Sequence, residues 1–190
     1  MLTERIIGAF TFRTSVYAEV ENDTTFTTTA WMIVAVVAFF NQLGTRASSN
    51  LFSWLAGTIV GTIFALIGFA IAALIISWVG RTVFYAEVNF DELVRTLGLA
   101  YVWNILGVFG AVVAFSEVLQ CVTAPAFILA WLLGLIAWFV AAKEALDLEW
   151  VQTIVTVVVG WIAFFAIMFV AGLILGVLGL SAAALGGFLT

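Results

Sequence analysis

The chain has 190 residues, of which 65% are hydrophobic and only 9% are charged, and its formal net charge is −5. An average soluble domain is roughly 25% charged, so the composition excludes an ordinary soluble protein, and the negative charge excludes a nucleic-acid partner, which needs clustered Lys and Arg. With no histidine and one cysteine, Cys121, the chain cannot form a His-ligated metal or haem site, a Cys–His nucleophile pair or an intrachain disulfide.

Long uncharged apolar runs dominate the sequence. A bilayer core requires about 20 helical residues, and these runs lack the apolar–polar alternation of a membrane β-barrel. They predict an all-α membrane protein with a single domain over 1–190, a bundle of five transmembrane helices preceded by an N-terminal segment over 1–24. The expected spans cover about 26–43, 51–79, 97–115, 124–142 and 151–178.

The N-terminal segment contains no apolar signal-peptide core, so the first apolar run is interpreted as a retained helix. Residues 3–17 are expected to form a short interfacial helix, because apolar and aromatic residues can share one flank while two arginines reach lipid headgroups. These residues are Ile6, Ile7, Phe10 and Tyr17 on the flank, with Arg5 and Arg13.

The basic residues predict the orientation of the spans, because cytoplasmic loops are enriched in Lys and Arg. Five of the six basic residues lie in segments that five spans would place on one side, and Arg46 is the exception. The N-terminus is therefore expected in the cytoplasm and the C-terminus outside. Ten of the eleven acidic residues share the cytoplasmic side, with Glu117 as the exception. The five basic residues are Arg5, Arg13, Arg81, Arg95 and Lys143.

The tetrapeptide YAEV occurs at 17–20 and again at 85–88, each time just before a predicted span. One interpretation is a duplicated two-helix unit, since internal repeats are common in transporters. The favoured interpretation is chance combined with a shared need for aromatic and acidic residues where a membrane helix begins. Either way, both copies are expected on the cytoplasmic surface.

The polar residues of the cytoplasmic side are expected to form one surface, because three segments at one end of a five-helix bundle lie close together. We call this surface the acidic strip, and it is predicted to contact a protein partner or to shape the membrane. Its residues are Tyr17, Glu19, Glu21, Asp23, Glu87, Asp91, Glu92, Arg95, Lys143, Glu144, Asp147 and Glu149.

No Asp, Glu, Lys or Arg falls inside a predicted span, which argues against a pump or a proton-coupled transporter. The Asn104 amide is expected to form a hydrogen bond between helices. Two pairs of glycines four residues apart are expected to pack helices closely, with a dimer contact as the alternative. These pairs are Gly57 with Gly61 and Gly172 with Gly176.

Three charged segments resemble prokaryotic members of the Yip domain family, named for proteins that interact with Ypt/Rab GTPases. They are "ERIIGAFTF…VYAEVENDTTFTTTA" at 4–30, "LVRTLGLAY" at 93–101 and "AAKEALDLEWVQTIVTVVVGW" at 141–161. The resemblance implies five spans, a cytoplasmic N-terminus and no enzymatic activity. Eukaryotic members bind Rab-type GTPases and carry a long N-terminal region with Asp-Leu-Tyr-Gly-Pro, a motif that this chain lacks.

These observations favour a non-enzymatic membrane scaffold or adaptor, without a cofactor, in the cytoplasmic (inner) membrane of a bacterium. Its expected partners are membrane lipids and other membrane proteins or itself, and the resemblance adds GTPase binding. One alternative is a carrier of a lipid or small molecule, which would need a polar-lined cavity around Asn104 and Thr58. Another is an accessory subunit of a larger respiratory or photosynthetic membrane complex.

Overall fold

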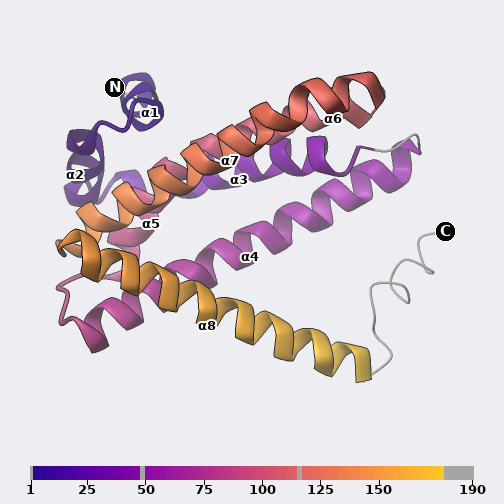
Figure 1. Ribbon diagram of the computed structural model, residues 1–190. Coiled ribbons are helices and arrows are strands. Elements are labelled where there is room, and N and C mark those ends of the chain that lie inside the picture. Colours follow the sequence, from indigo (N-terminus) through magenta and orange to yellow (C-terminus); the bar gives the residue numbers. More distant parts are fainter. Residues whose placement is uncertain (1, 48–49, 115–116, 178–190) are drawn as a thin grey trace.

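The computed structural model describes residues 2–47, 50–114 and 117–177, and every regular element within these ranges is a helix (Figure 1). Two short helices precede the long ones, and the third membrane stretch is divided into three consecutive helical pieces. In chain order the helices are α1 (Leu2–Phe10), α2 (Thr14–Asn22), α3 (Phe26–Thr45), α4 (Leu51–Val83), α5 (Phe90–Ala100), the 3₁₀ helix η1 (Tyr101–Phe109), α6 (Gly110–Ala114), α7 (Glu117–Leu146) and α8 (Trp150–Val177).

Four helical stretches in the described part of the chain are long and apolar enough to cross a membrane: Phe26–Thr45, Leu51–Val83, Phe90–Val112 and Phe127–Leu146. This confirms an all-helical, membrane-embedded protein. Large apolar side chains point outwards from these helices, as expected where lipid replaces water: Phe64 is 63% exposed and Trp131 is 65% exposed.

The fifth predicted span coincides with α8, apart from residue 178, which lies outside the described residues. Within α8, the apolar stretch Trp150–Ile162 is shorter than a full span, and most of the side chains after it lie outside the described residues. The number of five spans therefore stays a prediction. The fourth predicted span lies inside α7.

The third membrane stretch begins seven residues earlier than the predicted start at 97. A capping box starts α5: Asn89 Oδ1 accepts from the Glu92 N–H at 3.0 Å, and Glu92 Oε2 accepts from the Asn89 N–H at 2.8 Å. Two turns of the helix therefore precede the apolar run, and they carry Asp91, Glu92 and Arg95. The prediction that no ionisable residue lies in a span holds for 97–115 but not for this longer helix.

The backbone of the 3₁₀ helix η1 lies very close to the backbone of α3. A Cβ added at Gly44 of α3 would collide with the Gly107 carbonyl and lie 2.7 Å from Val108 Cα. Nine residues is long for a 3₁₀ helix, in which runs beyond 3–4 residues are uncommon. Close packing against α3 stabilises it.

The N-terminal segment forms two helices in place of the single predicted one. The chain turns at Phe12, whose φ of 55° is left-handed, and the Arg13 N–H donates to the Gly8 carbonyl at 2.9 Å. The Phe12 ring stacks on Trp103 of η1 at 5.4 Å, so the turn is anchored to the bundle. The apolar residues predicted to share one side of a single helix do not do so, because Ile7 is 54% exposed whereas Tyr17 is fully buried. The interfacial location of this segment stays a prediction.

Candidate functional site

The segments that carry the acidic strip lie at one end of the bundle. Figure 1 shows α2 beside α5, with the corner between α7 and α8 next to them, and α2 contacts both α5 and α7. The fold therefore joins segments far apart in the sequence into one surface. Five carboxylates of the strip are exposed, namely Glu19, Glu87, Asp91, Asp147 and Glu149. Five members are half-buried, namely Glu21, Asp23, Glu92, Lys143 and Glu144.

Tyr17 and Arg95 were expected in the strip, but neither side chain can contact a partner. Tyr17 is fully buried and Arg95 is 4% exposed. Burial raises the pKa of the Tyr17 phenol, whose hydroxyl has no hydrogen-bond partner among the described residues. Both residues act inside the fold, because α2, which carries Tyr17, packs against α5, which carries Arg95, and against α7.

Arg95 fastens α2 to the membrane helices. Its Nε donates to the carbonyls of Val20 and Glu21, each at 3.0 Å, and Nη2 donates to the Glu21 carbonyl as well. Its Nη1 donates to Thr27 Oγ1 at 3.2 Å. The last carbonyls of a helix have no partner within the helix, and a cation there also interacts favourably with the helix dipole. The sequence contains a signal for this role, because an arginine flanked by apolar residues must find acceptors inside the protein.

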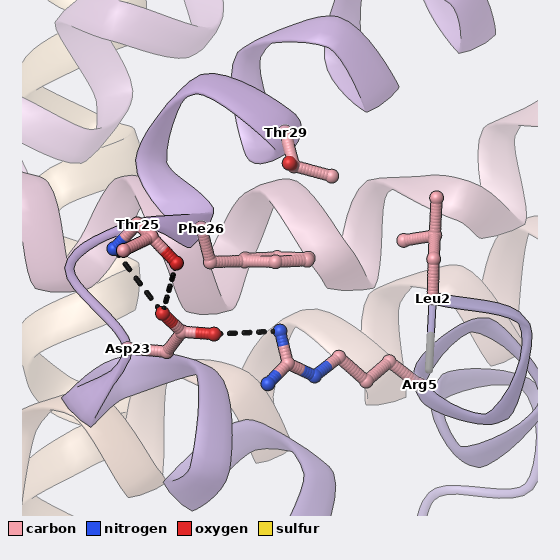
Figure 2. A pocket seen from close by; sticks show the side chains of 6 residues that line it. All are labelled: Leu2, Arg5, Asp23, Thr25, Phe26 and Thr29. Atoms are coloured by element: carbon pink, nitrogen blue, oxygen red, sulfur yellow. Dashed lines mark hydrogen bonds and ion pairs between the residues drawn. The ribbon is translucent and has the colours of Figure 1, made fainter.

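A second arginine, Arg5 of α1, holds the other side of α2. Its guanidinium pairs with Glu19 at 2.6 Å and with Asp23 at 2.9 Å, and it lies over the Phe26 ring. Figure 2 shows Arg5 reaching Asp23 across a shallow pocket of about 300 Å³, while Asp23 accepts from Thr25 at the start of α3. The hydrogen bond from Thr25, followed by Arg5, lowers the pKa of Asp23. Arg5 was expected to reach lipid headgroups, but these carboxylates engage it.

Glu21 has the most perturbed carboxyl of the strip. Burial, followed by repulsion from Asp147, Glu92 and Glu144, raises its pKa to about 7, and Arg95 opposes the shift. A carboxyl in this position changes its charge near neutral pH, so the charge of the strip is sensitive to pH.

The two YAEV copies have different conformations. The first lies within α2, whereas the second lies in the irregular connection between α4 and α5. Tyr17 is buried, but Tyr85 is 85% exposed and has a φ of 58°. Tyr85 ends α4 by turning the chain so that the Ala86 N–H donates back to the Gly80 carbonyl at 3.1 Å. The shared letters therefore do not correspond to a shared local structure.

The predicted packing residues have several roles. Gly57 and Gly61 face the Arg46 side chain of α3, so their contact lies within the chain. Asn104 does not form the expected bond through its amide. The bond between helices runs from Asn41 Nδ2 to the Asn104 backbone carbonyl at 2.8 Å, while Asn104 Nδ2 donates to the Tyr101 carbonyl of its own helix. Gly172 and Gly176 fall within α8, where the surroundings of both lie outside the described residues.

A cavity of about 830 Å³ lies among α3, α4, η1, α7 and α8. Asn104 lines it, but Thr58, the other residue expected there, does not, and Thr58 is fully buried. Aromatic rings form much of the wall, including Trp138 and Trp161, whose ring centroids are 5.7 Å apart. The structure thus has two candidate sites, an ionic surface at one end and an apolar cavity within the bundle.

The described residues contain no group of three or more Asp, Glu, Cys or His placed to hold a metal ion. Comparison with known proteins finds no matching family model, no matching curated protein and no matching solved structure. The chemistry of the two sites therefore has to be inferred from their own residues.

Proposed function

We propose that this protein is a non-enzymatic membrane adaptor of the Yip type whose acidic strip binds a protein partner with a basic surface. The observation that supports the proposal is that five carboxylates are exposed on α2, α5, the α4–α5 connection and the α7–α8 corner, and that α2 contacts both α5 and α7. Opposite charges across an interface steer association and select the partner.

Three basic side chains beside the strip are engaged within the chain, and in the strip only Glu19 and Asp23 are described as paired with one of them. The exposed carboxylates of Glu87, Asp91, Asp147 and Glu149 therefore remain available to a partner. Arg95 is buried beneath α2, and Arg5 pairs with Glu19 and Asp23. Lys143 lies over the Trp150 ring at 5.5 Å.

In this proposal α8 is the fifth span, and the strip faces the cytoplasm of a bacterium from its inner membrane. The distribution of Lys and Arg supports this orientation. The resemblance to the Yip family in the charged segments also supports it. The proposal covers an accessory subunit too, because a membrane-embedded partner could bind the same carboxylates.

The test is cross-linking in intact membranes, followed by mass spectrometry of the recovered partners. The triple variant Glu87→Gln, Asp147→Asn, Glu149→Gln should lose a partner that the wild type recovers, because the variant removes three exposed charges from the strip and leaves the Arg5–Glu19 pair intact. The variant Glu117→Gln is the matched control, since it removes a carboxylate expected on the opposite side. If the triple variant recovers the same partners in the same amounts, the adaptor proposal is wrong. The class of the recovered partner distinguishes a soluble protein from a membrane complex.

A further inference from the structure

The cavity among α3, α4, η1, α7 and α8 has the size and composition of a site for an apolar ligand. Its volume of about 830 Å³ falls within the range of about 300–1,000 Å³ typical of ligand pockets. None of its lining residues is charged. Its walls belong to the helices that are long and apolar enough to span a membrane and to α8, so molecules dissolved in the bilayer can reach it. These features exclude an ion or a charged metabolite as the occupant of its interior.

One part of the cavity wall is polar, where Asn41, Thr45 and Asn104 lie. The Asn41 and Asn104 amides each use one N–H, in bonds to the carbonyls of Asn104 and Tyr101. Each amide keeps an oxygen and a second N–H without a described partner. An amide facing an apolar cavity is costly unless something satisfies it. An ester or hydroxyl group of a ligand can do so.

A cation lies beyond this polar part of the wall. The Arg46 side chain packs on Gly57 and Gly61 of α4, and Ala65, one turn further along the same helix, lines the cavity. Arg46 Nε donates to Gln42 at 2.6 Å, and the residue is exposed. A guanidinium in this position can bind a phosphate, which is the group that Arg recognises with paired hydrogen bonds.

We propose that the cavity binds one phospholipid of the bilayer. One acyl chain lies among the aromatic rings, the ester region contacts Asn41 and Asn104, and the phosphate contacts Arg46. The order of these groups along the site, from apolar through neutral polar to cationic, matches the order of groups along a phospholipid. The site is independent of the acidic strip, which lies at the other end of α4.

The experiment counts retained lipid by native mass spectrometry on the full-length protein in mild detergent, with added dioleoyl phosphatidylglycerol. The wild type should retain one molecule. The double variant Ala65→Phe, Ala130→Phe fills the cavity from two walls and should retain none. The control Val36→Phe adds the same ring at a position of α3 that is 53% exposed and outside the cavity, and it should retain the lipid. Absence of lipid on the wild type, or equal retention by the filled variant, would overturn the proposal.

Two milder variants keep the test decisive if the filled variant does not fold. Asn104→Leu leaves the bond from Asn41 intact, because that bond ends on the backbone, and it should still weaken lipid retention. The wild type should prefer phosphatidylglycerol over dioleoylglycerol, which lacks the phosphate, by roughly tenfold. Arg46→Gln should abolish that preference, whereas Arg81→Gln, at the other end of α4, should keep it. A preference that survives Arg46→Gln, or a lipid-free dimer of the wild type, would contradict the site.

Discussion

Arg95→Met is expected to release α2 from the membrane helices while leaving those helices intact. The substitution keeps an apolar stem of similar length, but it removes the arginine's donors to the carbonyls of Val20 and Glu21 and to Thr27. The Val20 carbonyl keeps the Asp23 N–H at 3.3 Å, whereas the Glu21 carbonyl loses its described donors in a region where Arg95 itself is only 4% exposed.

The magnitude follows from two opposing effects. A hydrogen bond to a charged group contributes about 1.5–3 kcal/mol, and an unsatisfied buried acceptor costs about 1–3 kcal/mol. Removing a buried guanidinium recovers part of its desolvation penalty. We therefore expect the docking of α2 to lose about 2–3 kcal/mol net, which increases the undocked population roughly 30- to 150-fold.

Hydrogen–deuterium exchange of the protein in lipid nanodiscs measures this population directly. Amides of residues 14–22 should exchange faster by that factor in Arg95→Met, whereas amides in the middle of α4 should not change. Arg81→Met is the matched control, because it removes a positive charge from an exposed position. Wild-type protection of residues 14–22 in Arg95→Met would refute the reasoning, since α2 would then be held by its apolar face and by Arg5 without any contribution from Arg95.

Three further outcomes follow from the structure. Because the pKa of Glu21 is raised to about 7, the folded state binds its proton more tightly than the unfolded state, whose pKa is near 4.5. The free energy of unfolding should therefore fall as pH rises from about 4.5 to about 7, by about 1 kcal/mol after solvent screening. Thermal unfolding at pH 5 and pH 8 measures this difference, and Glu21→Gln should remove it. Tyr85→Gly should raise the thermal midpoint by a gain of about 0.5–1 kcal/mol, because Tyr85 is left-handed and exposed, whereas Tyr85→Ala should give no gain. Gly44→Val should lower the free energy of chemical unfolding by more than about 3 kcal/mol, because the added side chain meets the Gly107 backbone. Gly57→Ala should lower it by about 1 kcal/mol or less, since the added methyl meets only the flexible Arg46 side chain, at 3.6 Å.

The predicted helix boundaries agree with the structure to different degrees. Long apolar runs placed α3 and α4 close to their observed ranges, since the bilayer imposes both length and composition on a span, whereas α7 begins at Glu117, seven residues before the predicted start at 124. The start of α5 was placed too late because the capping box formed by Asn89 and Glu92 was not considered, although its spacing is visible in the sequence.

By itself, the sequence determined that the protein is helical and membrane-embedded and that its charges concentrate in a few segments, because hydropathy and charge are properties of the chain alone. Only the tertiary structure decided which charges are available. Arg95 and Tyr17 were both expected in the exposed strip, but the packing of α2 against α5 and α7 buries both. The same holds for the two YAEV segments and for the cavity around Asn104, because a conformation or a void depends on contacts between residues distant in the chain.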